Sequence, residues 1–60
     1  MKMRKIYQCY VWHENFGHDS YLVCGADLKE AKEELGNRLD NETIYPAREW
    51  HILSIKEVKD

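Results

Sequence analysis

The segment from Asp27 to Leu39 constrains the fold most, because its end signals and its apolar spacing both indicate a helix. Asp27 is a good N-cap, since its carboxylate can accept hydrogen bonds from the free N–H groups of the first turn, and Glu30 completes a capping-box pattern. The apolar residues fall in one narrow stripe: Leu28, Ala31, Leu35 and Leu39. The sequence therefore predicts an amphipathic helix with a single buried face. Asn41 is expected to end it in the left-handed conformation.

The residues before this helix predict a β-hairpin. Residues 6–13 and 20–24 are rich in aromatic and β-branched side chains, which favour strands. The polar connection between them, residues 14–19, contains Gly17, a residue that tight turns favour. A two-residue loop at 16–17 and a four-residue loop at 15–18 give the same pairing, with His13 opposite Ser20.

This register divides the hairpin into an aliphatic side and an aromatic side. The aliphatic side places Val11 opposite Leu22 and Cys9 opposite Cys24, with Tyr7 beside them. The aromatic side places Trp12 opposite Tyr21 and Tyr10 opposite Val23. Because a slip of one residue would mix the two sets, the register is well determined if one side is buried. We expect the aliphatic side to face the helix.

The chain after the helix predicts one further strand. Pro46 cannot continue a helix, so residues 40–47 form a connection, and residues 49–58 read as extended. Apolar side chains lie on both faces of this strand, so either Leu53 and Ile55 or Trp50 and Ile52 complete the core. The order strand, strand, helix, strand favours an α+β fold, ββαβ, in which a three-stranded antiparallel sheet of order 2-1-3 carries one helix on one face. Residues 1–60 then form a single small domain.

Length and charge limit the classes of function. A chain of 60 residues buries only about 60% of its unfolded surface, so we expect self-association, most simply as a homodimer, to supply further stability. The net charge of −2 gives no general attraction to nucleic acid or to an anionic membrane. The apolar runs are too short for a membrane span or a signal peptide, which predicts a cytoplasmic protein.

The side chains that carry metal or nucleophilic chemistry show no recognisable spacing. His13, His18 and His51 form no zinc-type pattern with each other or with the cysteines, so we predict no metal, no cofactor and no catalytic residue. His13 and His18 are interpreted as polar residues of the hairpin tip. Cys9 and Cys24 are expected to be reduced core thiols, in preference to a cross-strand disulfide.

The uncovered aromatic side of the sheet is the predicted partner-binding surface. Its candidate contact residues are Tyr10, Trp12, Tyr21 and Trp50. The leading hypothesis is a small non-enzymatic protein that binds another protein, and the outer strands offer a second mode through strand addition. The alternative is a nucleic-acid or nucleotide-binding module that stacks bases on the same aromatic residues, with cations from Lys2, Arg4, Lys5 and Lys56.

The segment from Val23 to Ala31 resembles a pattern common in very small proteins encoded by phages and mobile elements. In that pattern a strand ending in valine and a small residue passes through an acidic cap into a helix that begins with a Glu-Ala pair, here Glu30 and Ala31. The strand–strand–helix–strand layout is also similar. The resemblance implies a non-enzymatic protein that binds a host component, such as an inhibitor of a host enzyme or of an antiviral defence system.

Overall fold

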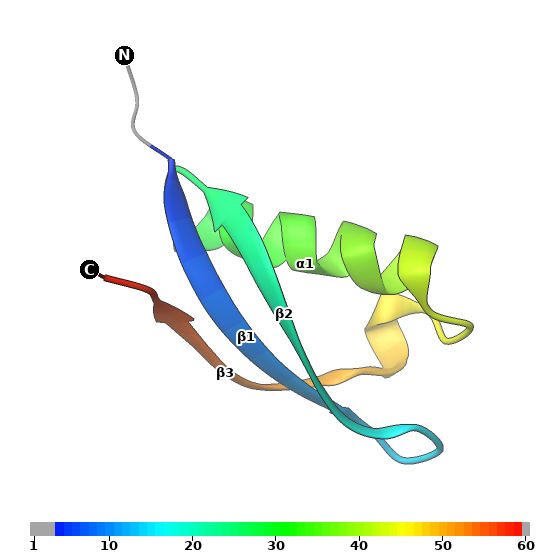
Figure 1. The fold of residues 1–60 in the computed structure, drawn as a ribbon. Helices are drawn as coiled ribbons and strands as arrows, with labels where there is room; N and C mark the ends of the chain where they lie inside the picture. Colours follow the sequence, from blue (N-terminus) through cyan, green and yellow to red (C-terminus); the bar gives the residue numbers. More distant parts are fainter. Residues whose placement is uncertain (1–3, 60) are drawn as a thin grey trace.

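The computed structural model describes residues 4–59 and contains a three-stranded sheet, one long helix and one short 3₁₀ helix (Figure 1). In chain order the elements are β1 (Lys5–His13), β2 (Gly17–Gly25), α1 (Leu28–Glu42), η1 (Ala47–Glu49) and β3 (His51–Glu57). Both strand pairs are antiparallel and the strand order is β2-β1-β3. The predicted ββαβ fold with strand order 2-1-3 is therefore confirmed. Within the described residues, no helix is long and apolar enough to cross a membrane.

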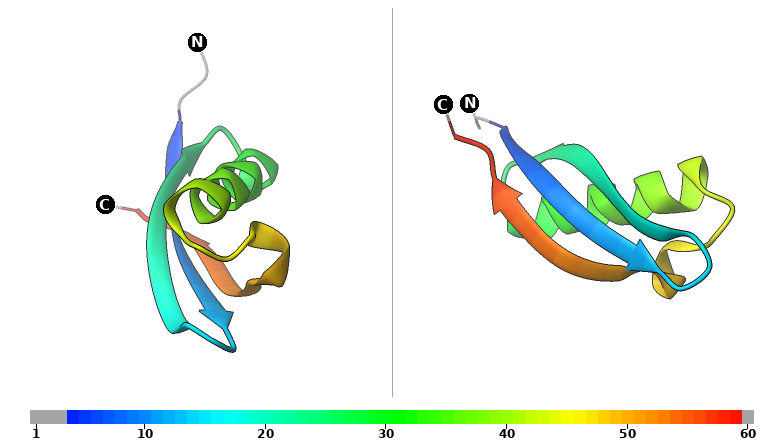
Figure 2. Two further views of the ribbon diagram at one scale, coloured as in Figure 1. Left: turned by 90° about the vertical axis from the view of Figure 1, so that its right-hand side faces the viewer. Right: turned by 60° about the horizontal axis from the view of Figure 1, so that its bottom comes forward.

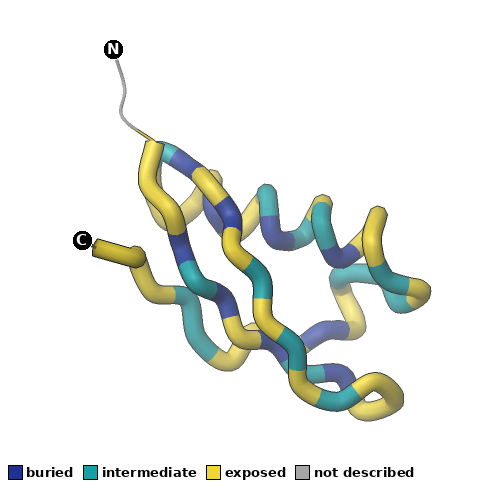
Figure 3. Tube along the Cα trace, in the orientation of Figure 1, coloured by how far each residue is buried: buried dark blue, intermediate teal, exposed yellow. Residues whose placement is uncertain are grey.

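The molecule consists of two layers, because α1 lies on one face of the sheet and leaves the other face uncovered (Figure 2). The helix packs mainly on β2, and η1 follows it on the same side of the sheet. The buried core lies between the layers. It contains the following residues: Tyr7, Cys9, Val11, Val23, Ala31, Leu35, Leu39 and Trp50. Figure 3 shows the buried positions alternating along β1, as expected for a strand with one covered face.

The cap at the start of α1 agrees with the sequence-based prediction, but the end of the helix does not. The Asp27 carboxylate accepts a hydrogen bond from the Glu30 N–H at 3.0 Å, and the Glu30 carboxylate accepts one from the Ala26 N–H at 2.9 Å. The prediction that Asn41 ends the helix in a left-handed conformation is wrong, because α1 continues to Glu42. Thr43 caps it with extended backbone, and its hydroxyl lies 2.7 Å from the Leu39 carbonyl oxygen.

The predicted hairpin register is wrong by three residues. His13 lies opposite Gly17, where Ser20 was expected, so the connection has three residues. The Phe16 N–H donates to the His13 carbonyl oxygen at 3.1 Å, and Gly17 follows with a φ of 100°. This left-handed backbone explains why glycine stands there, and a three-residue loop followed by a left-handed residue is a common hairpin connection.

An odd shift in register exchanges the two faces of β2. Val23, expected on the aromatic side, is buried under α1, whereas Leu22 and Cys24 are exposed on the opposite face. The expectation that both cysteines are core thiols is therefore correct for Cys9 and wrong for Cys24, and neither forms a disulfide. The β1 half of the prediction is correct, since Tyr7, Cys9 and Val11 all face the helix.

The last strand starts later than expected and mixes the two predicted faces. Trp50 is buried just before β3, and Ile55 packs against the core opposite Cys9. An irregularity opposite Tyr10 and Val11 shifts the register, so Ile52 and Leu53 are both exposed. Such a bulge adds a residue to one strand and breaks its alternation. Each predicted pair thus contributes one residue to the core.

Candidate functional site

The open face is the sheet surface that points away from α1. The strand register and the alternation of burial assign it eleven residues: Ile6, Gln8, Tyr10, Trp12, His18, Ser20, Leu22, Cys24, His51, Ser54 and Lys56. No helix or loop between residues 4 and 59 covers this surface (Figures 1 and 2). Within that range the open face therefore has no packing partner.

Large apolar side chains on the open face are about half exposed. The exposed fraction is 47% for Ile6, 47% for Tyr10 and 56% for Leu22, and Leu53 at the bulge is exposed as well. Tyr10 lies on the central strand, between Ser20 of β2 and Ser54 of β3. Trp12 is partly buried, and its ring centroid lies 5.4 Å from that of His51. Contiguous exposure of this kind marks interaction surfaces more often than isolated apolar residues do.

The open face has an unusual charge composition. Lys56 is its only residue with a formal charge at neutral pH, and none of its eleven residues is acidic. The two acidic residues within the strands, Asp19 and Glu57, pair with Val11 and Tyr7 and so lie on the covered side. The helix, by contrast, has five acidic residues along its length. The carboxylates of the strands and of α1 therefore lie on the covered side of the sheet, whereas Glu14 and Glu49 lie at the hairpin end of the sheet, near His51.

The structure brings together two of the four predicted contact residues. Tyr10 and Trp12 lie on the open face, whereas Tyr21 and Trp50 lie on the side of the sheet that carries α1. Trp50 is 6% exposed, and its ring N–H donates to the Tyr45 carbonyl oxygen at 3.3 Å. Tyr21 was assigned to the wrong face because the predicted register was wrong. Trp50 was assigned to the wrong face because it follows the turn of η1 and is not part of the regular strand.

Tyr21 contributes to the contact between sheet and helix. The Arg38 guanidinium lies 5.4 Å from the centroid of its ring and donates to the Leu22 carbonyl oxygen at 3.1 Å. Burial raises the pKa of the Tyr21 phenol, and the nearby Asp19 carboxylate raises that pKa further. The Tyr21 ring is thus in contact with a helix residue on the covered side of the sheet.

Ile6 and Leu22 are exposed apolar residues of the open face that the sequence reasoning did not name as candidates. The assumed loop length placed Leu22 on the covered side, because an odd shift in register is needed to turn it away from the helix; the face of Ile6 on β1 does not depend on the loop. The signal that could have placed Leu22 is Gly17, since a glycine at the end of a three-residue loop indicates the observed register.

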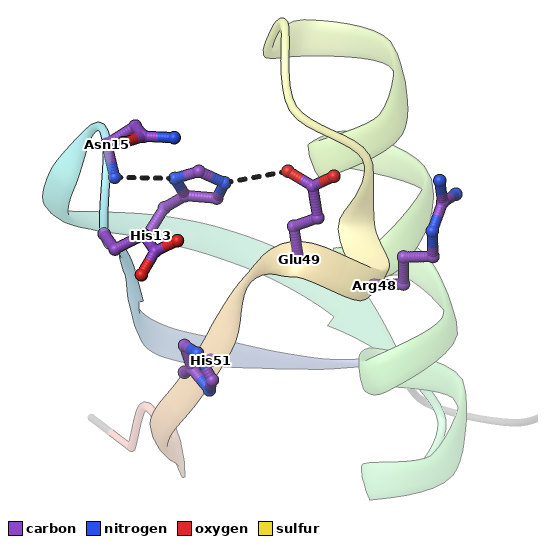
Figure 4. Close-up of a pocket in the computed structure, with 6 residues that line it drawn as sticks. His13, Asn15, Arg48, Glu49 and His51 are labelled. Atoms are coloured by element: carbon purple, nitrogen blue, oxygen red, sulfur yellow. Dashed lines mark hydrogen bonds and ion pairs between the residues drawn. The ribbon is translucent and has the colours of Figure 1, made fainter.

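A second candidate site is a cavity of about 460 Å³ between the hairpin tip and η1 (Figure 4). Polar residues line it: His13, Glu14, Asn15, Arg48, Glu49 and His51. His13 is only 2% exposed, so it is a buried residue and not the polar tip residue that the sequence suggested. Its Nδ1 accepts a hydrogen bond from the Asn15 N–H at 3.0 Å, and its Nε2 lies 3.0 Å from a Glu49 carboxylate oxygen.

The hydrogen bonds of His13 define a structural role. Because Nδ1 accepts, the ring proton is assigned to Nε2, which donates to Glu49. The ring also stacks on Tyr45, with 3.9 Å between centroids. Arg48 points away from His13 (Figure 4), and the lining contains no thiol or hydroxyl nucleophile. Between residues 4 and 59 there is no group of three metal-ligating side chains that could hold a metal ion. The cluster joins the hairpin tip to the chain before β3.

Fold and surface together define a small α+β domain with a single helical layer and one uncovered sheet face. Comparison with known proteins adds no family to this description, because no family model, no curated protein and no solved structure matches the chain significantly.

Proposed function

We propose that this chain is a non-enzymatic protein-binding module that contacts its partner through the open face. The observation that carries this proposal is the exposure of Ile6, Tyr10 and Leu22 on a sheet surface that none of the other described elements covers. Apolar side chains placed side by side lose contact with water when a partner covers them, and this transfer drives most protein association.

The layout of the open face suits a protein partner. Tyr10 lies near its centre on β1, where aromatic anchors contribute most to binding, and Trp12 is two residues away. Hydroxyl and amide groups of Ser20, Ser54 and Gln8 flank these rings and can exchange hydrogen bonds with the partner. The candidate contact residues are therefore Ile6, Tyr10, Trp12 and Leu22.

The kind of partner follows from the resemblance of residues 23–31 to small phage and mobile-element proteins. A protein of that kind would bind a host component in the cytoplasm and inhibit it by occupying a surface that the host enzyme or defence system needs. In this role the chain itself needs no catalytic residue. The open face would present the partner with a rigid surface, since it is built on three paired strands.

Affinity capture from the native host with paired variants tests this proposal. Tyr10→Ser and Leu22→Ser remove apolar contact at two points of the open face, and we expect each to weaken capture of the specific partner at least tenfold. Ile44→Ser is the matched control, because Ile44 is 87% exposed and lies in the connection after α1. Equal capture by all the folded proteins would show that the open face is not the binding surface.

A second candidate function is binding of single-stranded nucleic acid, which the absence of carboxylates from the open face favours. Tyr10 and Trp12 could stack on bases, while Lys56 and Arg4 approach phosphates; Lys2 lies outside the described residues. Salt separates the two functions. Nucleic-acid binding should weaken steeply as salt rises from about 50 to 200 mM, whereas contacts between apolar surfaces should change little.

A further inference from the structure

The two outer strands of the sheet differ in what their outer edges offer to another chain. The Val58 N–H donates to the Ile6 carbonyl oxygen at 2.8 Å, so the even-numbered residues of β1 direct their main-chain groups toward β3. Because these directions alternate along a strand, the odd-numbered residues of β1 bond to β2. The register then determines which residues of β2 and β3 direct their main-chain groups outward, away from β1.

Side chains of the protein itself engage the outer edge of β2. Ser20 and Leu22 lie opposite even-numbered residues of β1, so their main-chain groups point outward. The Ser20 N–H donates to the Asp19 carboxylate at 2.8 Å, and the Arg38 guanidinium donates to the Leu22 carbonyl oxygen at 3.1 Å. Arg38 belongs to α1, which packs on this strand. A further strand along β2 would have to displace both contacts.

The outer edge of β3 has no such contacts. Ile55 and Glu57 lie opposite Cys9 and Tyr7, odd-numbered residues of β1, so their N–H and C=O groups point away from the sheet. Between residues 4 and 59, no side chain forms a hydrogen bond with these groups, and Figure 2 shows no described element beyond β3. We call the outward main-chain groups of these two residues the β3 edge. Unpaired groups of this kind are a template for a further strand.

The side chains along the β3 edge define the segment that would fit. Ile55 packs against the core but is only partly buried, since α1 lies mainly over β2. An apolar side chain beside Ile55 would therefore extend the core. Lys56 is exposed on the open face and has no ion-pair partner within residues 4–59, whereas Glu57 has Lys5 at 3.9 Å. A carboxylate opposite Lys56 would supply the missing countercharge.

A second copy of β3 does not meet this requirement. Glu57 is the only acidic residue of β3, and it is one of the residues whose main-chain groups point outward. In an antiparallel pair that joins two β3 edges, outward residues lie opposite outward residues. Glu57 of a copy therefore never lies opposite Lys56. The segment that supplies the carboxylate has to come from a different chain.

We propose that the β3 edge binds an extended, acidic segment of another protein as a fourth, antiparallel strand. In this strand an apolar residue lies opposite Ile55, and the residue before it is acidic and lies opposite Lys56. Antiparallel addition lets Ile55 and Glu57 each exchange two main-chain hydrogen bonds with the segment. The inference does not rest on the proposed function, because the main-chain groups of the edge form the contact.

NMR titration of the full chain with a short blocked peptide, acetyl-Lys-Thr-Glu-Val-Thr-Val-amide, tests this edge. We expect amide shifts concentrated at residues 54–58 and slower hydrogen exchange at Ile55 and Glu57 when the peptide is bound. The valine that follows the glutamate is designed to lie opposite Ile55. N-methylation of its amide removes a donor to the edge and should weaken binding at least about tenfold. N-methylation of the glutamate amide, which points away from β3, should leave binding unchanged.

A charge swap tests recognition of the acidic residue. Lys56→Glu should weaken binding of this peptide at least about threefold, and it should strengthen binding of the peptide with lysine in place of glutamate by a similar factor. Lys32→Glu is the matched control, because Lys32 is exposed on α1. Leu22→Ser, on the other outer strand, should also leave peptide binding unchanged. Circular dichroism verifies that each variant is folded.

Three outcomes would overturn the proposal: no binding at about 1 mM peptide, shifts that fall on β2 or spread over the open face, or equal weakening by the two N-methyl groups. An equal response of Lys56→Glu and Lys32→Glu would overturn the acidic specificity, and self-association mapped to residues 54–58 would assign the edge to a second copy. If the edge binds no peptide while Tyr10→Ser still loses the host partner, the proposed function stands alone. Peptide binding at the edge together with capture unaffected by Tyr10→Ser would refute only the proposed function.

Discussion

The two faces of the sheet differ although they are built from the same strands. On the covered face Cys9, Val11 and Val23 are fully or almost fully buried, whereas on the open face Tyr10 and Leu22 are about half exposed. A chain of 60 residues with one helix can cover only one side of a three-stranded sheet. Apolar residues on the other side cannot serve the core of a single copy. The difference indicates that the buried core lies under α1, and it is the reason why we propose the open face as the binding surface.

Truncating one leucine in the core and one on the open face should give the largest difference in the free energy of unfolding. Leu35 is fully buried in the core, so Leu35→Ala should lower the free energy of unfolding by about 2–5 kcal/mol. Leu22→Ala on the open face should change it by less than about 0.5 kcal/mol at concentrations where the chain is monomeric. Urea unfolding followed by circular dichroism measures both. Similar losses for the two variants would mean that the open face is buried in the folded state.

Two glycines test how closely the covered face and α1 approach each other. A methyl group at Gly25 would lie 2.8 Å from the Ala31 backbone nitrogen and 2.9 Å from the Glu30 Cβ, so Gly25→Ala should destabilise the fold by about 1–3 kcal/mol. At Gly36 the nearest atom is the Ala47 Cβ at 4.0 Å, which leaves room.

Gly36→Ala should therefore act in the opposite direction. It should stabilise the helix by up to about 1 kcal/mol, because alanine is the better helix former. Thermal unfolding of both variants measures the two signs. A loss of stability in both would show that the space beside Gly36 is filled by a contact that a methyl group cannot tolerate.

The sequence predicted the parts of this structure that local signals determine. Asp27 and Glu30 form the expected cap, and Ala31, Leu35 and Leu39 face the sheet, because capping and periodicity act within a few residues. Leu28, the fourth residue of the predicted buried stripe, is 45% exposed, so the prediction was wrong at the first residue of the helix. The strand order also followed, since few topologies suit one helix and three short strands.

The candidate site was harder to predict because it depends on register. One additional choice, the length of the loop before Gly17, decides whether Leu22 or Val23 faces the helix. Trp50 was misplaced for a different reason: the turn at η1 and the bulge in β3 interrupt the alternation from which its face was inferred. Tyr10 and Trp12 were placed correctly relative to Cys9 and Val11 because β1 is central and regular.

The buried core on the covered side is apolar except for the polar cluster around His13. Substitution of Glu49 tests what this cluster contributes to stability. Glu49→Ala leaves the buried Nε2–H of His13 without its acceptor, so we expect a loss of about 1 kcal/mol in the free energy of unfolding. Glu14→Ala is the control, because Glu14 lines the same cavity without a hydrogen bond to His13. A loss below about 0.3 kcal/mol for Glu49→Ala would indicate that water replaces the carboxylate.

The two cysteines report directly on the two faces, since Cys9 lies on the covered side and Cys24 on the open one. Burial raises the pKa of the Cys9 thiol, so at a given pH less of it is in the reactive thiolate form, and α1 also blocks access to the sulfur. In the native protein at pH 8 we expect iodoacetamide to modify Cys24 at least roughly tenfold faster than Cys9, because thiol reactivity depends on ionisation and on access.

Mass spectrometry of the modified peptides over time measures this ratio, and unfolding in urea should bring it near one. Equal rates for the two thiols in the native protein would contradict the division of the sheet into a covered and an open face, on which the proposed function depends.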